Sequence, residues 1–263
     1  MCLFFCEKDQ KRGVYLTLEE FFKENPEVAV AFSGGVDSAC LLYAAKAAKA
    51  RVKAYYVKSE FQPEFELQDA RRMAQELEVE LCILEVSVLS EEKVRKNPKD
   101  RCYDCKRLMF NAIAEAAKRD GFSVLLDGTN ASDQAEDRPG MRALQELSVL
   151  SPLRQCGLKK EEIRRLSKEW GLFTWNKPAY ACLATRISTG EEITSEKLRA
   201  TQEAESYLFS LGFRDFRVRR YGNGARLQII KEQLPLLMTC RQEILERLKT
   251  WYETVLLDLE VRA

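Results

Sequence analysis

Four short apolar runs separated by longer helical stretches constrain the fold of this 263-residue chain most strongly. The runs are rich in β-branched and aromatic residues and cover 28–32, 52–57, 81–86 and 124–128. Between them, 38–50 and 68–80 have the composition and apolar spacing of crossover helices. Because strands that alternate with helices form parallel sheets covered on both faces, the sequence predicts an α/β domain.

A different pattern follows the helix expected at 159–171. It consists of a helix near 195–211, a hairpin at 213–230 with Gly-Asn-Gly at its turn, a helix at 232–249 and a strand at 254–261. We therefore expect an α/β domain over 1–190 and a small α+β domain over 191–263. The second domain would serve substrate binding or oligomerisation.

Charge and composition exclude several classes of protein. Lys and Arg total 42 against 41 for Asp and Glu, so a net charge of +1 gives no general attraction to nucleic acid or an anionic membrane. The chain has no long apolar run or signal-like leader, and its nine cysteines lack the spacing of a secreted scaffold. These features predict a soluble cytoplasmic protein. Because histidine is absent, Ser-His-Asp triads, Cys-His pairs and His-ligated zinc are excluded.

The string AFSGGVDSACLL, residues 31–42, predicts an anion site. Gly34 and Gly35 follow a strand and precede a helix, so several N–H groups and the positive end of the helix dipole converge. Ser33 and Ser38 add hydroxyl groups, and Asp37 could hold Mg²⁺ against phosphates. A simple tight turn with Ser or Asp as N-cap is the alternative. The string lacks the Gly-Lys-Ser ending of a Walker loop and the dinucleotide fingerprint.

Three cysteines are candidates for metal ligation or reactivity. Cys102-x-x-Cys105 begins an expected helix and supplies two thiols, whereas zinc needs about four ligands and a cubane cluster is commonly held by four thiolates. Cys182 lies in the irregular stretch PAYACLATRISTG, residues 178–190. Burial as a small apolar side chain is the alternative for Cys182. Three thiolates on a cubane would leave one iron open.

Two further groups of residues are candidates for positioning a substrate. Asp127 ends a strand and Thr129 follows it in an Asx-rich turn that could simply satisfy its own backbone. Arg217 and Arg219 alternate onto one strand face and Arg226 lies on the return strand, where the three could bind a phosphate or remain solvated. Lys106 beside the cysteine pair could join them, while Lys177 stays undecided.

The SGGVDS string between a strand and a helix resembles the signature of the PP-loop ATP pyrophosphatases, with their adenine nucleotide alpha hydrolase-like fold. The resemblance implies that ATP is cleaved between its α and β phosphates. AMP is transferred to a carbonyl or carboxyl oxygen, and a nucleophile then displaces it. The ATP and Mg²⁺ residues it implies are Ser33, Gly34, Gly35, Val36, Asp37, Ser38, Asp127, Gly128 and Thr129.

Three longer segments, 125–140, 170–190 and 211–229, extend the resemblance over nearly the whole chain, to the LarE family of sulfur transferases. That family implies adenylation of a carboxylate on pyridinium-3,5-dicarboxylate mononucleotide, followed by its conversion to a thiocarboxylate. Two rounds give the dithiocarboxylate needed for the nickel-pincer nucleotide. The resemblance also implies a homo-oligomer such as a hexamer.

Members of that family differ in their source of sulfur. Some sacrifice one cysteine, which matches Cys182, whereas others hold a [4Fe-4S] cluster on a Cys-x-x-Cys pair and a third cysteine. Because Cys102, Cys105 and Cys182 are all present, we expect the cluster type, with sacrifice of Cys182 as the alternative. A tRNA thiolase is a further alternative, and so is a non-catalytic nucleotide-binding regulator with a structural metal.

Overall fold

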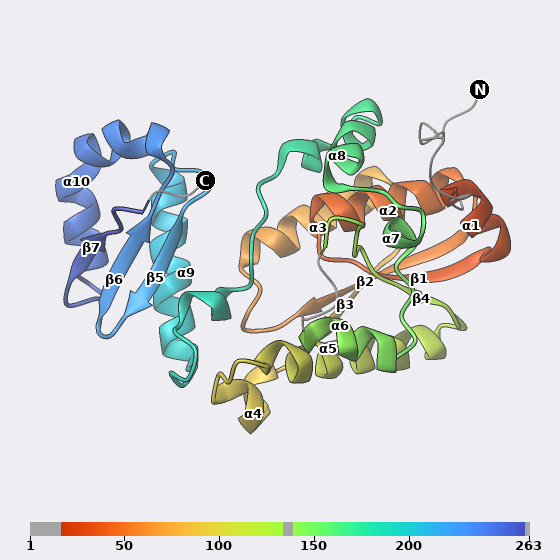
Figure 1. Ribbon diagram of the computed structural model, residues 1–263, viewed down its shortest axis with the longest axis horizontal. Helices are drawn as coiled ribbons and strands as arrows, with labels where there is room; N and C mark the ends of the chain where they lie inside the picture. Colours follow the sequence, from red (N-terminus) through yellow and green to blue (C-terminus); the bar gives the residue numbers. More distant parts are fainter. Residues whose placement is uncertain (1–16, 134–138, 261–263) are drawn as a thin grey trace. The chain divides into compact units, whose positions relative to one another are not determined.

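The computed structural model describes residues 17–133 and 139–260 (Figure 1). The chain divides into two compact units, each described by itself below. The first contains the chain up to Ser59 together with Glu64–Val86 and Asp100–Lys177. The second contains Glu60–Pro63, Ser87–Lys99 and the chain from Pro178 onward. None of the helices in the described ranges is both long and apolar enough to cross a membrane.

A parallel sheet of four strands forms the centre of the first unit, as the sequence predicts. The strands are β1 (Glu27–Ala31), β2 (Arg51–Lys58), β3 (Leu81–Glu85) and β4 (Leu125–Leu126), in the order β3-β2-β1-β4. Every adjacent pair is parallel. In such sheets, ligands bind at the carboxyl ends of the strands, at the point where the order of strands along the sheet reverses. Here that place lies between β1 and β4.

Helices cover both faces of this sheet (Figure 1). One face carries α1 (Leu18–Glu24), α2 (Val36–Ala47), α3 (Glu64–Glu76), α7 (Pro152–Gln155) and α8 (Lys160–Glu169). The opposite face carries α5 (Arg101–Arg119) and α6 (Pro139–Glu146). The unit therefore has three layers, which confirms the α/β prediction.

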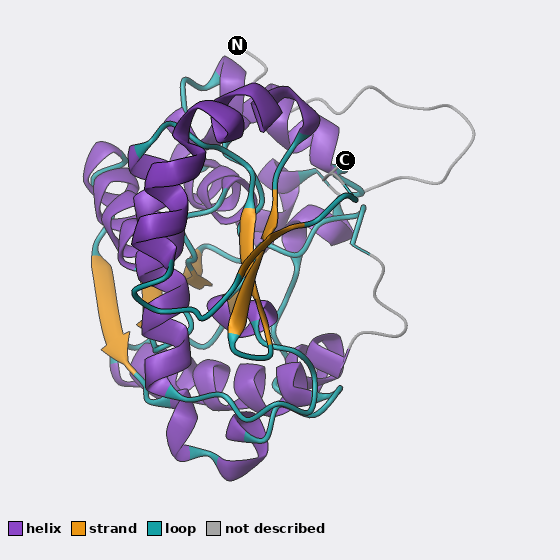
Figure 2. Ribbon diagram, turned by 90° about the vertical axis from the view of Figure 1, so that its left-hand side faces the viewer, coloured by secondary structure: helices purple, strands orange, loops and turns teal. Residues whose placement is uncertain are grey.

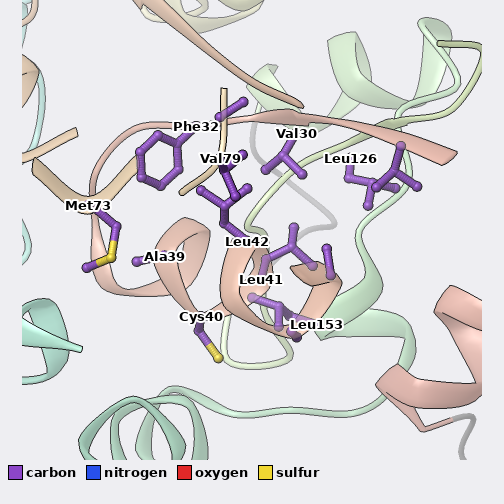
Figure 3. Close-up of a cluster of buried hydrophobic side chains, with 14 of the residues drawn as sticks. Val30, Phe32, Ala39, Cys40, Leu41, Leu42, Met73, Val79, Leu126 and Leu153 are labelled. Atoms are coloured by element: carbon purple, nitrogen blue, oxygen red, sulfur yellow. The ribbon is translucent and has the colours of Figure 1, made fainter. Parts of the chain in front are cut away.

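The side chains along each strand alternate between two hydrophobic cores, because successive side chains of a strand point to opposite faces of the sheet. Val28 and Val30 pack into the core beneath α2, whereas Ala29 between them packs against the α5 side. On β2, Tyr56 and Tyr55 divide in the same way. Figure 3 shows part of the first core. Burying a large apolar side chain of this kind contributes about 1.5–3 kcal/mol.

The second unit is a small α+β structure, again as predicted. Its sheet has the order β5-β6-β7, with β5 (Arg217–Tyr221) and β6 (Gly224–Gln228) antiparallel and β7 (Val255–Leu257) parallel to β6. Its long helices are α9 (Ser195–Ser210) and α10 (Leu234–Leu248), whose inner faces share one apolar core with the sheet. Helices and strands are distinguished by colour in Figure 2.

Two loops that precede residue 100 belong to this second unit. The Leu183 N–H donates to the carbonyl of Phe61 at 3.0 Å, and the Gly190 N–H donates to the carbonyl of Asn97 at 2.8 Å. The second loop, Ser87–Lys99, contains the short helix α4 (Glu92–Arg95). Along the chain, the first unit ends at Lys177 and the second continues from Pro178. The domain division expected after residue 190 stays a prediction.

Candidate functional site

The loop after β1 is held open by two glycines. Gly34 has φ +71°, and a Cβ there would lie 3.1 Å from both the Ala70 N and the Glu66 carbonyl oxygen of α3. Gly34 therefore meets a conformational and a packing requirement at once. Gly35 is the N-cap of α2, and because glycine has no side chain, no side-chain hydrogen bond caps this helix. Helix α2 begins at Val36, slightly before the expected start.

Two serines stabilise this loop from within. Ser38 Oγ donates to the Gly35 carbonyl at 3.2 Å and lies 3.1 Å from Ser33 Oγ. Ser38 is buried, whereas Ser33 is exposed. Because the first-turn N–H groups of a helix lack intrahelical partners, the open end of α2 can accept an anion.

Asp37, in the first turn of α2, combines one paired and one unpaired carboxylate oxygen. Lys160 Nζ donates to Asp37 Oδ2 at 2.6 Å. Asp37 Oδ1 is buried and has no hydrogen-bond partner among the described residues. Burial raises the pKa of Asp37, although Lys160 acts in the opposite direction. A buried acceptor without a donor fits a bound cation, so this carboxylate suits Mg²⁺.

The segment after β4 packs directly on residues 33–38, which comprise the loop after β1 and the first turn of α2 and are called the phosphate loop below. A Cβ on Gly128 would lie 3.0 Å from the Ser38 N, which explains why glycine stands at this position. Asp127 is buried and accepts hydrogen bonds from Ser151 Oγ at 2.6 Å and from the Thr129 hydroxyl. The structure thus brings Asp127, Gly128 and Thr129 to the loop, with the Asp127 carboxylate fixing two hydroxyl groups.

The predicted Cys-x-x-Cys motif occupies the first turn of α5. Cys102 is exposed and Cys105 is buried. The neighbouring Lys106 is half-buried and passes over Gly140, whose hypothetical Cβ would lie 2.9 Å from Lys106 Cδ. Among residues 17–133 and 139–260, no salt bridge to the Lys106 ammonium occurs.

In the second unit, Cys182 lies on a segment whose backbone is fixed on both sides. Cys182 is a half-buried residue and is the N-cap of a 3₁₀ turn at Leu183–Arg186. The Cys182 carbonyl accepts from the Thr185 N–H at 3.0 Å and from Thr185 Oγ1 at 2.8 Å. Arg186 Nη1 donates to the Ala181 carbonyl at 3.0 Å.

A buried ion pair anchors this segment to α9. Arg186 Nε and Nη2 donate to the two carboxylate oxygens of Glu205 at 2.8 and 3.1 Å, and both side chains are at most 2% exposed. Glu205 also accepts from the Val218 N–H at 2.9 Å and from the Tyr180 hydroxyl. Desolvation lowers the pKa of Arg186, but the hydrogen bond and charge of Glu205 outweigh it, so that pKa is raised.

The β5–β6 hairpin places the three predicted arginines on one face. Arg219 pairs directly with Arg226, and Arg217 pairs with Gln228 two residues away. Arg217 is buried and donates to the Ala179 carbonyl at 2.6 Å, and Arg219 donates to the Thr185 carbonyl. Two of the arginines therefore contact the Cys182 segment, while Arg226 lies 3.4 Å from the Asp258 carboxylate.

Sequence reasoning missed several residues that the structure brings to these places. Lys160, Ser151 and Glu205 lie on expected helices or ordinary polar stretches, and nothing in their local spacing indicates a partner. Arg186 was visible only as a basic residue four positions after Cys182. Ser151 lies 24 residues from Asp127, and Lys160 lies 123 residues from Asp37. Arg186 and Glu205 are 19 residues apart.

No group of three Cys, Asp or Glu side chains that could hold a metal ion occurs among residues 17–133 and 139–260. Cys102 and Cys105 lie in the first unit and Cys182 lies in the second. The thiol donor set is chemically suited to iron, because cubane clusters are held by cysteine thiolates. Ligation by these three cysteines stays a prediction.

Comparison with known proteins shows the family to which the chain belongs. The family described as PP-loop domain matches residues 8–155. An uncharacterized protein of Synechocystis sp. is 36% identical over 82% of this chain and 81% of its own length. The pyridinium-3,5-bisthiocarboxylic acid mononucleotide synthase of Lactiplantibacillus plantarum is 30% identical over 92% of this chain and 89% of its own length. An uncharacterized protein of Methanocaldococcus jannaschii is 30% identical over 93% of both chains.

Proposed function

This chain belongs to the PP-loop family, and within it to the LarE family, and from that premise we propose that it inserts sulfur into pyridinium-3,5-dicarboxylate mononucleotide. Family membership supports ATP-dependent sulfur transfer in general. The identity of the acceptor rests on the product named for the Lactiplantibacillus relative. The structural observation that carries the proposal is the half-buried Cys182 on a fixed backbone, beside a strand that bears arginines.

The first proposed step uses the phosphate loop. A substrate carboxylate oxygen attacks the α-phosphorus of ATP, the bond to the β-phosphate oxygen breaks, and pyrophosphate leaves with its negative charge. The open N-terminus of α2 and the Ser33 hydroxyl stabilise that charge. Asp37 Oδ1 would hold Mg²⁺, which when bound neutralises phosphate charge.

The second proposed step replaces AMP by sulfur on the activated carboxyl carbon. In the sacrificial route the Cys182 thiolate attacks that carbon and AMP leaves. Removal of the Cα proton of Cys182 then breaks its Cβ–S bond, which leaves dehydroalanine in the protein and a thiocarboxylate on the product. The hydrogen bonds to the Ala181 and Cys182 carbonyls keep the thiol in a constant position for this attack.

A [4Fe-4S] cluster held by Cys102, Cys105 and Cys182 is the source of sulfur that the sequence favours, and the sacrificial route is its alternative. Such a cluster, when bound, supplies sulfide from outside the polypeptide. Cys182 would then be a ligand and would remain intact. Exposure of Cys102 and the position of both thiols in one helical turn support this route.

The mononucleotide phosphate requires cationic partners. We propose Arg219, Arg226 and Lys106 as contacts, together with Arg217 after exchange of its carbonyl partners. Exposure of the Arg226 side chain, 40%, supports its availability. A cytoplasmic location and a homo-oligomer such as a hexamer are also proposed. Exposed apolar side chains in the second unit support association, namely Tyr221, Met238 and Leu256.

Anaerobic purification followed by turnover tests the proposal. The protein is assayed for iron and sulfide and then supplied with Mg²⁺, ATP and the pyridinium dicarboxylate mononucleotide. Pyrophosphate release together with formation of a thiocarboxylate supports the proposed function, and ATP cleavage without sulfur in the product contradicts it. Loss of the mass of one H₂S from Cys182 identifies the sacrificial route, whereas unchanged protein mass over repeated turnovers identifies the cluster route.

Two other functions give different results in the same experiment. A tRNA thiolase would retain tRNA after purification and would release pyrophosphate only when tRNA is added. A nucleotide-binding regulator would bind ATP without releasing pyrophosphate from any of these mixtures. The near-neutral net charge of +1 disfavours the tRNA alternative.

A further inference from the structure

Lys177, which the sequence left undecided, contacts the phosphate loop directly. Its Nζ donates to the Gly34 carbonyl oxygen at 3.2 Å and pairs with Asp69 Oδ2 of α3 at 2.6 Å. The Lys177 side chain is 16% exposed, and its ammonium lies 5.7 Å from the centre of the Phe65 ring. One lysine thus ties a loop carbonyl to the helix on which the loop packs.

This contact restrains the orientation of the Gly34–Gly35 peptide. The Gly34–Gly35 peptide has glycine on both sides, and glycine permits conformations that other residues exclude. In a trans peptide the carbonyl and the following N–H point in opposite directions. By holding the Gly34 carbonyl, Lys177 therefore also restrains the direction of the Gly35 N–H, which donates to Ser33 Oγ at 3.4 Å. A flipped peptide would present a carbonyl oxygen to an anion and repel it.

The position of Lys177 is itself fixed from α8. Arg164 Nη1 donates to the Trp175 carbonyl at 2.7 Å, and Arg164 Nη2 donates to the Lys177 carbonyl at 2.8 Å. Arg164 lies one helical turn after Lys160, which pairs with Asp37. The same face of α8 thus contacts both the backbone of Lys177 and the carboxylate of Asp37.

We propose that Lys177, held by Asp69, is a positioning residue of the phosphate loop, which keeps the Gly34–Gly35 peptide oriented for binding the phosphates of ATP. Lys177 would act through the loop backbone and would not contact the phosphates. The inference rests on the ATP-binding half of the proposed function and is independent of sulfur transfer. Its test therefore uses neither the mononucleotide nor sulfur.

The experiment measures the affinity of the purified full-length chain, with Mg²⁺, for α,β-methylene-ATP and for adenosine by calorimetry. Lys177→Met is expected to weaken the triphosphate analogue about tenfold, the usual effect of losing a hydrogen bond to a charged group, and to leave adenosine unchanged. Lys177→Arg restores a donor and should stay within about threefold of the parent affinity. Lys168→Met is the matched control, because exposed Lys168 lies over the Trp175 ring.

Asp69→Asn separates positioning from direct phosphate binding. If Lys177 positions the peptide, loss of its carboxylate partner lets the ammonium move, and the analogue binds more weakly. If Lys177 binds phosphate directly, removal of the competing carboxylate makes the analogue bind more tightly, and the proposal is overturned. Unchanged analogue affinity in Lys177→Met, or equal weakening of adenosine and analogue, also overturns it. Should Lys177→Met fail to fold, Asp69→Asn and Lys177→Arg still give these opposed results.

Discussion

The phosphate loop and the Cys182 segment both present reactive groups, but different parts of the chain hold them in place. In the loop, Gly34 packs closely against α3 backbone atoms, and the side chains of Ser38 and Lys177 bond to the carbonyls of the two glycines. In the Cys182 segment, side chains from α9 and β5 hold the backbone through Glu205, Arg217 and Arg219. The first arrangement leaves an unpaired Asp37 oxygen for a cation, whereas the second leaves a thiol at intermediate exposure.

The largest expected effect is that of Cys182→Ala, which should change sulfur transfer without changing nucleotide binding. Cys182→Ala should abolish thiocarboxylate formation, because both proposed sulfur sources use this residue, while the affinity for an ATP analogue stays unchanged. Product analysis by mass spectrometry and calorimetry measure the two quantities. Cys240→Ala is the control, since Cys240 is also a half-buried free cysteine of the second unit. Retained sulfur transfer in Cys182→Ala would contradict the role given to this residue.

Because the Cys182 segment depends on the buried Arg186–Glu205 ion pair, a single side-chain change there should strongly lower the free energy of unfolding. Glu205→Gln leaves the Arg186 charge buried without its carboxylate, which typically costs about 3–5 kcal/mol in the free energy of unfolding. Glu203→Gln on the same helix is the control. Glu203 lies 4.0 Å from Arg199 at the surface, and such pairs contribute about 0–1 kcal/mol. Equal effects of both changes in urea titrations would refute the anchoring role of Glu205.

The loop should respond to backbone strain together with packing. Gly34→Ala places a methyl group 3.1 Å from the α3 backbone at φ +71°, so the affinity for an ATP analogue should fall about 10- to 100-fold, equivalent to about 1–3 kcal/mol. Gly171→Ala is matched in conformation, with φ +70°, but has no neighbour within 4 Å. A loop that tolerates Gly34→Ala as well as Gly171→Ala would show that packing on α3 is unimportant.

Titration of Asp37 should make ATP binding pH-dependent. Burial raises the pKa of Asp37, so at the proposed Mg²⁺ site its proton would compete with the cation at a higher pH than the proton of an ordinary carboxyl group. The affinity for the Mg²⁺ complex of an ATP analogue should therefore fall as pH decreases through this raised pKa. Lys160→Met removes the group that opposes the shift and should move the transition to still higher pH. A pH profile unchanged in Asp37→Asn would exclude Asp37 as its source.

The sign of the stability effect of Asp37 follows from the same shift. A carboxyl group whose pKa is raised in the folded state binds its proton more tightly there than in the unfolded chain. Asp37 therefore lowers stability above its folded pKa, and this penalty disappears as pH falls below its unfolded pKa. Comparison of Asp37→Asn with the parent protein in urea titrations across pH measures the difference.

The smallest expected effect concerns the environment of Lys106. Gly140→Ala would place a methyl group 2.9 Å from Lys106 Cδ, at a flexible side chain that can shift. The KM for the mononucleotide should rise about threefold, equivalent to less than 1 kcal/mol, with the affinity for ATP unchanged. In a Lys106→Met background the same change should have no further effect on KM. An additive effect there would show that Gly140 does not act through Lys106.

Much of the first region could be predicted because its information is local. The apolar runs predict the strands, and the Gly-Gly pair between a strand and a helix predicts the loop, since backbone conformation depends on adjacent residues. Asp127 could be placed at a strand end for the same reason. Its contact with Ser151 could not, because Ser151 follows 24 residues later in an ordinary polar stretch.

The second region was predictable only in part. Strand alternation placed Arg217 and Arg219 on one face and Arg226 on the return strand, and the observed register adds that Arg226 lies directly opposite Arg219. That two of them donate to carbonyls of the Cys182 segment depends on the packing of elements more than 30 residues apart. The loops Glu60–Pro63 and Ser87–Lys99 join the second unit for a similar reason, through contacts with residues 183–193.

By itself, the sequence determined the parallel α/β layers, the phosphate loop, the α+β unit and the three cysteines, because periodicity, glycine position and residue chemistry are properties of neighbouring residues. Only the tertiary structure decided that Lys160 pairs with Asp37, that Lys177 holds the Gly34 carbonyl and that Glu205 anchors Arg186. These partners meet because helices and loops distant in sequence pack on common surfaces. A polar side chain acquires its particular partner from that packing.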